Sequence, residues 1–297
     1  MTRIAYIGLG TMGMEMARRL VGLDVDLVIW NRSSGEAVDE LERAGARRAE
    51  SVVEAMDADI VFSMLADDTA VLERFDESTL GAARRGSVHV NMSTISVETA
   101  VRLTDAHRAA GIAYVAAPVL GRPPVAAAGE LNILAGGAAD AIAAAAPYLD
   151  VLGKRTWIVG DEPRTANLVK IAVNYNLIHA LQALAESVTL VEQGGVDGGQ
   201  FVDILTDAAF TGSAYSGYGP MIAARDYSPA LFSLPLGLKD LGLAEGAAAS
   251  EGVSLPSAGV LRDLFERALA DPDLDGLDWS AVAEVTRAMT VPADGAS

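Results

Sequence analysis

The 297-residue sequence contains no cysteine, which excludes disulfide bonds, thiolate metal sites and a cysteine nucleophile. No apolar stretch reaches the roughly 18 residues that a membrane-spanning helix needs. The opening Met-Thr-Arg-Ile-Ala-Tyr-Ile runs directly into an apolar strand pattern and lacks the regions of a signal peptide. These three absences together lead us to expect a cytoplasmic protein.

Basic residues are also scarce, since 22 Lys and Arg stand against 40 Asp and Glu, a net charge of −18. Such an acidic surface repels nucleic acids and anionic membranes, so we expect a small-molecule ligand instead. Only three basic residues are lysine: Lys154, Lys170 and Lys239. A partly buried Lys can lose its proton near neutral pH, whereas Arg cannot. Each lysine is therefore either a candidate catalytic residue or a lysine that is present by chance and has no role in catalysis.

The length suits two domains rather than one core. Strand and helix patterns alternate up to Gly160, and only helical patterns follow. We expect an α/β Rossmann-like domain with a mostly parallel sheet over residues 1–162. Residues 163–297 are expected to form an all-helical domain for substrate binding and dimerisation, including an interdomain helix over 164–193.

The predicted elements follow from these patterns. Strands are expected near residues 3–8, 26–30, 47, 59–65, 88–92, 112–116, 131–134 and 156–159, with an irregular stretch at 118–124. After residue 193, helices are expected near 197–209, 216–226, 236–250, 256–270 and 278–289.

A glycine-rich turn follows the first predicted strand, with the sequence Gly8-Leu9-Gly10-Thr11-Met12-Gly13. It stands between a strand and an amphipathic helix, which is the context that the G-x-G-x-x-G motif requires. The glycines permit a tight turn and let a pyrophosphate approach the helix N-terminus, where free N–H groups favour anions. We therefore predict dinucleotide binding by residues 8–13.

The second strand ends in Asn31-Arg32-Ser33, where an NAD-binding unit usually has an acidic residue for the ribose 2′-hydroxyl. Arg suits a 2′-phosphate through paired hydrogen bonds. These three residues favour NADP(H) over NAD(H). The alternative is that Arg32 is a surface residue that opens the next helix.

Other strand ends also belong to the carboxyl edge of the predicted sheet, where ligands bind in doubly wound folds. Met64 and Leu65 follow one strand, and Ser93 and Thr94 follow the next. We expect Met64 and Leu65 to contact the cofactor.

The stretch 164–193 contains no Gly or Pro and is apolar nearly all round, which predicts one long helix buried on every side. Asn167, Lys170 and Asn174 interrupt it at spacings of three and four, so they share one face. Burying such a polar stripe costs free energy unless something uses it. Lys170 is therefore either a structural lysine satisfied by a partner domain or a catalytic lysine.

Several motifs, in this order, resemble the β-hydroxyacid dehydrogenase family, relatives of 6-phosphogluconate dehydrogenase that include 3-hydroxyisobutyrate dehydrogenase. They are residues 8–17, 91–96, 117–119 and 129–137, Lys170 with Asn174, and Phe232 with residues 239–241. The resemblance runs from Gly8 to about Leu243. Two of the three lysines fall on the family's two functional lysine positions, which favours the catalytic interpretation of Lys170.

The resemblance implies NADP(H)-dependent hydride transfer to or from a small carbonyl or hydroxy compound, of the hydroxy acid or semialdehyde class. Lys170 would be the general acid and base if its surroundings lower its pKa towards neutrality. Asn174 would fix the substrate oxygen. Thr94 would contact the nicotinamide, Ser93 the substrate, and Lys239 would lie on the cofactor side. The family also implies a homodimer or tetramer. The spacing of His89 and His107 resembles no metal site, so we expect no metal.

The predicted substrate loop, Val119-Leu120-Gly121-Arg122, departs from the family pattern. Family members acting on hydroxy acids commonly have Ser-Gly-Gly here, and that Ser is replaced by Leu120. Arg122 either binds a carboxylate itself or points to solvent. Two alternatives remain open: an imine reductase, which shares the fold and NADPH, and a binding protein that senses NADP(H) without turnover.

Overall fold

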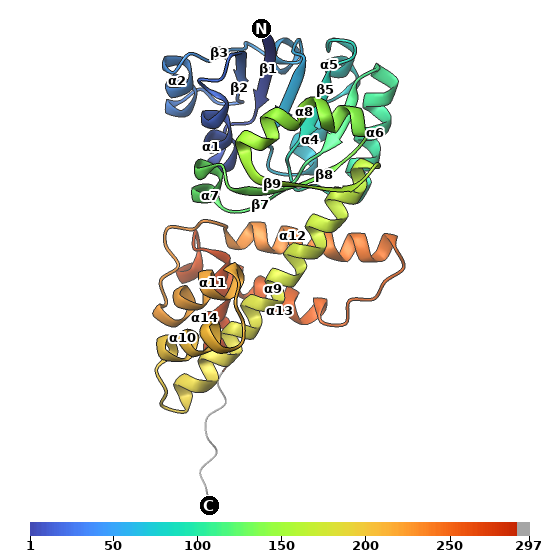
Figure 1. Ribbon diagram of the computed structural model, residues 1–297. Helices are drawn as coiled ribbons and strands as arrows, with labels where there is room; N and C mark the ends of the chain where they lie inside the picture. The colour runs from blue at the N-terminus through green and yellow to red at the C-terminus, as the bar shows by residue number, and fades with distance from the viewer. Residues whose placement is uncertain (290–297) are drawn as a thin grey trace, which may run out of the picture. The chain divides into compact units, whose positions relative to one another are not determined.

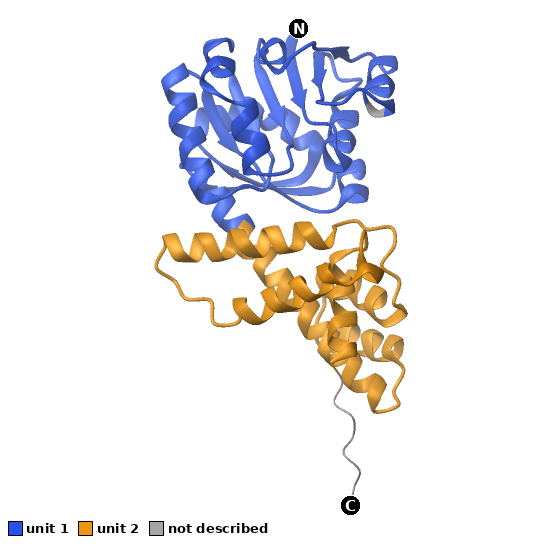
Figure 2. Cartoon of the chain, turned by 180° about the vertical axis from the view of Figure 1, so that it is seen from behind, with its two compact units in different colours: residues 1–170 blue, residues 171–297 orange. Residues whose placement is uncertain are grey.

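A computed structural model describes residues 1–289, apart from the side chain of Ala37. The chain divides into two compact units, one of residues 1–170 and one that starts at residue 171 (Figure 2). No helix among the described residues is long and apolar enough to cross a membrane.

Unit 1 is built on one nine-stranded sheet (Figure 1). Its strands are β1 (Thr2–Ile7), β2 (Val25–Trp30), β3 (Arg47–Arg48), β4 (Ile60–Ser63), β5 (Val88–Asn91), β6 (Ala113–Ala116), β7 (Val119–Leu120), β8 (Leu131–Gly136) and β9 (Gly153–Gly160). They lie in the order β3-β2-β1-β4-β5-β6-β8-β7, and β9 pairs with β8. Pairing from β3 to β6 is parallel throughout, and β8 is antiparallel to β6 and β7. The predicted mostly parallel sheet is confirmed.

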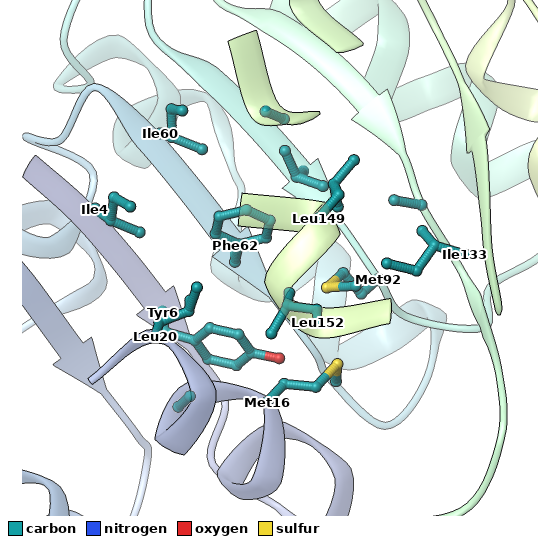
Figure 3. Close-up of a cluster of buried hydrophobic side chains, with 14 of the residues drawn as sticks. Ile4, Tyr6, Met16, Leu20, Ile60, Phe62, Met92, Ile133, Leu149 and Leu152 are labelled. Carbon is teal, nitrogen blue, oxygen red and sulfur yellow. The ribbon is translucent and has the colours of Figure 1, made fainter. Parts of the chain in front are cut away.

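Eight helices accompany the sheet: α1 (Thr11–Leu20), α2 (Glu36–Arg43), α3 (Val52–Ala55), α4 (Asp68–Arg74), α5 (Glu77–Gly81), α6 (Val97–Ala110), α7 (Pro123–Ala128) and α8 (Ala139–Leu152). Each face of the sheet has its own apolar cluster. One cluster joins α1, α2 and α8 to Tyr6 and Phe62, with Leu149 and Leu152 of α8 packed towards them (Figure 3). The other joins α3, α4, α5 and α6 to the opposite face. The alternation of side chains along each strand produces these two buried layers.

The stretch 118–124 is not irregular as expected. Val119 and Leu120 form β7, which pairs antiparallel with β8, and α7 begins at Pro123. Proline is compatible with the first turn of a helix because the N–H that it lacks has no partner there in any case. Two adjacent prolines therefore start a helix at a place where they suggested a loop.

Helix α9 (Pro163–Gln193) is continuous and confirms the predicted long helix. The expectation that it is buried on every side is wrong. Buried side chains such as Leu181 and Val188 recur along one stripe, whereas the Leu190 side chain on another face is 72% exposed. Alanines and scattered leucines are tolerated at protein surfaces, so apolar composition alone did not reveal the exposed face.

Unit 2 is helical, as predicted. After α9 it contains α10 (Gly198–Ala208), α11 (Ser213–Ala224), α12 (Leu234–Ser250), α13 (Ala258–Ala270), the short 3-10 helices η1 (Pro272–Leu274) and η2 (Trp279–Ala281), and α14 (Val282–Ala288). One apolar cluster holds these helices together, with Trp279 and Phe265 among its fully buried members. The buried stripe of α9 contributes Leu181, Leu184 and Val188 to it.

Candidate active site

The glycine loop lies between the end of β1 and the start of α1. A Cβ atom on Gly8 would lie 2.3 Å from the Met64 carbonyl oxygen, and one on Gly13 would lie 2.0 Å from the Gly8 carbonyl oxygen. A Cβ on Gly10 would meet nothing within 4 Å. Gly8 and Gly13 are therefore required for packing, while Gly10 leaves the backbone open to a ligand.

The first turn of α1 suits an anion. Thr11 and Met12 begin the helix, its N-cap is Gly10, and neither a capping side chain nor an acidic residue occupies this end. The first N–H groups of a helix need partners from outside it, and together with the helix dipole they favour negative charge. The residues present thus fit the pyrophosphate of a dinucleotide.

The end of β2 is tied to this loop. The Leu9 N–H donates to Asn31 Oδ1 at 3.0 Å, and Asn31 Nδ2 donates to the carbonyl oxygen and hydroxyl of Ser33 at 3.1 and 3.3 Å. Arg32 is exposed, and within residues 1–289 no carboxylate forms an ion pair with it. The guanidinium of Arg32 fits a ribose 2′-phosphate placed beside β2.

The turns that follow β4 and β5 are also joined. The Met64 N–H donates to the Ile7 carbonyl oxygen at 2.9 Å, and the Leu65 N–H donates to Ser93 Oγ at 2.8 Å. The Ser93 side chain is fully buried, whereas Thr94 is partly exposed. In unit 1 the predicted cofactor residues of β1, β2, β4 and β5 therefore gather at one edge of the sheet.

The predicted substrate loop lies farther along the sheet of unit 1. Val119 pairs with Ile133 and Leu120 with Asn132. Gly121 has a φ of +148°, and a Cβ there would lie 2.6 Å from a Leu131 methyl carbon. Arg122, half-buried, is the residue immediately before α7. The strand pairing and the glycine hold this loop in one conformation.

Lys170 and Asn174 lie one turn apart on α9, and their exposed fractions are only 9% and 3%. Asn174 Nδ2 donates to Asp240 Oδ2 at 2.5 Å, and Asp240 is itself buried on α12. Lys239 Nζ lies 3.3 Å from the other oxygen of Asp240. In unit 2 the structure thus brings Asn174 and Lys239 together around one carboxylate.

Asp240 was not among the predicted site residues, although it stands in the motif of residues 239–241. His89 and His107 were not among the predicted site residues either, because their spacing resembles no metal site. In the structure these two histidines are fully buried and hydrogen-bonded to each other, Nδ1 of His89 to Nε2 of His107, at 2.7 Å. Within residues 1–289, no group of three His, Asp or Glu side chains is arranged to hold a metal ion.

A cavity of about 440 Å³ in unit 1 contains none of the predicted site residues. It lies beside α6 and the start of α9, and its charged lining includes Arg108 and Arg164. Arg108 pairs with Asp105 at 3.0 Å and Arg164 with Glu162 at 2.9 Å. Both arginines are thus paired with carboxylates that also line the cavity.

Comparison with protein families gives two matches that together span most of the chain. Residues 3–160 match the NAD binding domain of 6-phosphogluconate dehydrogenase. Residues 165–286 match the domain described as NAD-binding of NADP-dependent 3-hydroxyisobutyrate dehydrogenase.

Individual relatives agree over almost their whole length. The chain is 40% identical to an uncharacterized oxidoreductase of Bacillus subtilis, covering 94% of this chain and 98% of the relative. It is 32% identical to glyoxylate/succinic semialdehyde reductase 1 of Arabidopsis thaliana, covering 96% and 98%. The structure of Mycobacterium tuberculosis 3-hydroxyisobutyrate dehydrogenase with L-serine matches with a TM-score of 0.87 and 30% identity, covering 97% and 99%.

Proposed function

Because the chain belongs to the 3-hydroxyisobutyrate dehydrogenase-like β-hydroxyacid dehydrogenase family, whose members are NAD(P)-dependent oxidoreductases, we propose that it is an NADP(H)-dependent dehydrogenase or reductase. Its substrate is a small semialdehyde or hydroxy acid, and Lys170 is the general acid and base. The observation that carries this proposal is the burial of Lys170 beside Asn174 on one face of α9, with Asn174 held by Asp240.

The cofactor residues divide by the part of NADP(H) that they would hold. Residues 8–13 would bind the pyrophosphate, and residues 31–33 the phosphorylated ribose, with Arg32 supplying the positive charge. Met64, Leu65 and Thr94 would line the nicotinamide side, and the family resemblance assigns Lys239 to the cofactor as well. When bound, NADP(H) supplies or accepts the hydride.

Lys170 moves the proton. During reduction its ammonium group donates to the substrate oxygen as negative charge develops there, and during oxidation the amine takes the proton back. Asn174 orients the same oxygen by a hydrogen bond, since its amide is held by Asp240. A positioned pair of this kind favours the transition state through both proton transfer and orientation.

The carboxylate of the substrate is assigned to the loop of residues 119–122. Leu120 offers no hydroxyl, so Arg122 is the residue there that can pair with a carboxylate. The relatives suggest the compounds to test: glyoxylate and succinic semialdehyde, 3-hydroxyisobutyrate, and L-serine.

A substrate panel tests the proposal. NADPH consumption is measured with glyoxylate, succinic semialdehyde, other small aldehydes, keto acids and cyclic imines, and NADP⁺ reduction with 3-hydroxyisobutyrate and L-serine. We expect turnover with a carboxylate-bearing semialdehyde or hydroxy acid. Turnover confined to imines would replace this proposal by the imine reductase alternative. NADPH binding without any turnover would favour the cofactor-sensing protein.

Arg32 carries the cofactor preference. In the Arg32→Ala variant the KM for NADPH is expected to rise about tenfold or more, because a charge-assisted contact with the 2′-phosphate is lost. The KM for NADH should change less than about twofold. Arg85→Ala, an exposed arginine ahead of β5 at the opposite edge of the sheet, is the matched control. An unchanged NADPH/NADH preference in Arg32→Ala would refute the assignment.

A further inference from the structure

A buried row of polar side chains connects α6 to the carboxyl ends of β4 and β5. His107 Nε2 lies 2.7 Å from His89 Nδ1, and His89 Nε2 lies 2.8 Å from Ser63 Oγ. His107 Nδ1 lies 2.7 Å from the Leu103 carbonyl oxygen. All three side chains have no exposed surface. We call His107, His89 and Ser63 the histidine relay.

The partners fix where each proton of the relay resides. The Leu103 carbonyl oxygen can only accept, so His107 carries its proton on Nδ1, and the Nε2 of a neutral His107 accepts. His89 must then donate from Nδ1 and accept at Nε2, which leaves the Ser63 hydroxyl as the donor. Burial holds the pKa of His89 well below its ordinary value and lowers the pKa of His107 to about 4, so both rings are neutral near pH 7.

Asn91, which pairs with Ser63 across β4 and β5, is the next residue in this row. Its Oδ1 accepts from the Ser93 N–H at 3.0 Å, and its Nδ2 donates to the Tyr114 hydroxyl at 3.1 Å. Ser63 Oγ lies 3.3 Å from Asn91 Oδ1. The Ser63 hydroxyl donates mainly to His89 at 2.8 Å and shares the same proton with Asn91 Oδ1 over the longer distance, a three-centre hydrogen bond that joins the relay to Asn91.

Ser93 extends the connection to the neighbouring turn, since its hydroxyl accepts the Leu65 N–H at 2.8 Å. Leu65 follows Met64, whose carbonyl oxygen packs against Gly8 of the glycine loop. Directional hydrogen bonds therefore run from α6 to the two turns, 64–65 and 93–94, that would hold the nicotinamide. Apolar side chains could fill this space but could not fix the direction of a backbone N–H.

We propose that Asn91, held by the histidine relay, positions turns 64–65 and 93–94 against the nicotinamide half of the cofactor. Asn91 and the relay are positioning residues and do not touch the reacting atoms. This inference rests on the proposed cofactor site. In Ser63→Ala, His89 Nε2 loses its donor, and the Asn91 amide is free to rotate towards it. The bonds from Asn91 to Ser93 and Tyr114 would then weaken.

The test compares a whole cofactor with its adenosine half. Dissociation constants are measured for NADPH, by its fluorescence, and for adenosine 2′,5′-bisphosphate, by competition; NADH and ADP-ribose replace them if the wild type prefers NADH. In Ser63→Ala the dissociation constant for NADPH is expected to rise about tenfold, the effect of one lost hydrogen bond. The dissociation constant for adenosine 2′,5′-bisphosphate should stay within about twofold of the wild-type value. Asn91→Ala should raise the dissociation constant for NADPH at least as much.

Ser87→Ala is the matched control. Ser87 directly precedes β5, at the end opposite Asn91, and its buried hydroxyl has no hydrogen-bond partner among the described residues. The Ser87→Ala variant should bind both ligands as tightly as the wild type does. The inference is wrong if Ser63→Ala and Asn91→Ala bind NADPH as tightly as the wild type does. It is also wrong if the two substitutions weaken the binding of NADPH and of adenosine 2′,5′-bisphosphate equally. If the wild type binds neither ligand, the proposed function fails as well.

Nitrogen NMR of the histidine rings tests the relay without any variant. The sequence has only three histidines, so the spectrum is simple. We expect His89 and His107 near pH 7 to be neutral and protonated on Nδ1. A proton on Nε2 of either ring would overturn the relay.

Discussion

At the scale of single residues, the buried histidines make stability depend on pH. Burial lowers the pKa of His107 to about 4, whereas a histidine in an unfolded chain titrates near 6.5. Between these values the unfolded state binds more protons than the folded state, so the free energy of unfolding falls as pH falls. The slope from one such histidine approaches about 1.4 kcal/mol per pH unit. Above about pH 7 this contribution is constant.

Urea unfolding at pH 7.5, 6.5 and 5.5 measures this effect. Hydrogen bonds and nearby arginines lower the pKa of the Asp59 and Glu54 carboxyls below their ordinary values near 4. Protonation of these two carboxyls therefore lowers the free energy of unfolding only below the pH range of this experiment. His107→Gln should show a shallower slope because it lacks the ionisable ring. A free energy of unfolding that stays constant from pH 7.5 to 5.5 would contradict neutral burial of the histidines.

At the scale of elements, α12 contains two glycines with opposite expected effects. A Cβ on Gly237 would lie 2.5 Å from the Phe265 ring and 3.1 Å from the Trp279 ring. A Cβ on Gly246 would meet nothing within 4 Å. Gly237→Ala is expected to lower the free energy of unfolding by about 1–3 kcal/mol through overpacking. Gly246→Ala should raise it by about 0.5–1 kcal/mol through helix propensity.

Thermal or urea unfolding of the two variants provides the measurement, and each serves as the control for the other. The same substitution in the same helix differs only in what the new methyl group meets. If both variants shift stability in the same direction, packing of α12 against α13 and η2 is not as described.

Local signals predicted the elements where they were strong. Helix α9, predicted over residues 164–193 from a stretch without Gly or Pro, spans Pro163–Gln193. The strand-turn-helix context of residues 8–13 likewise identified the glycine loop. The sequence did not reveal the contact between Ser63 and His89, because that contact depends on the register between β4 and β5. Nor did it reveal that Asp240 holds Asn174, since the two residues are 66 positions apart.

At the scale of the whole molecule, α9 belongs to both units. Contacts divide the chain after Lys170, whereas the sequence placed the functional boundary between 162 and 163, ahead of the helix. That boundary, the homodimer or tetramer and the cytoplasmic location stay predictions. The division places Lys170 in unit 1 and Asn174 in unit 2, on one continuous helix. The helix thereby fixes the spacing of the two proposed catalytic side chains.

The central claim is that Lys170 transfers the proton, and the kcat of Lys170→Ala with the best substrate of the panel tests it most directly. We expect kcat to fall about 10²-fold or more, the usual contribution of a positioned acid or base. The dissociation constant for NADPH should stay within about twofold. Lys154→Ala, which removes an exposed lysine of β9, should keep the wild-type kcat. A Lys170→Ala enzyme that retains kcat within about threefold of the wild type would contradict the proposed role of Lys170.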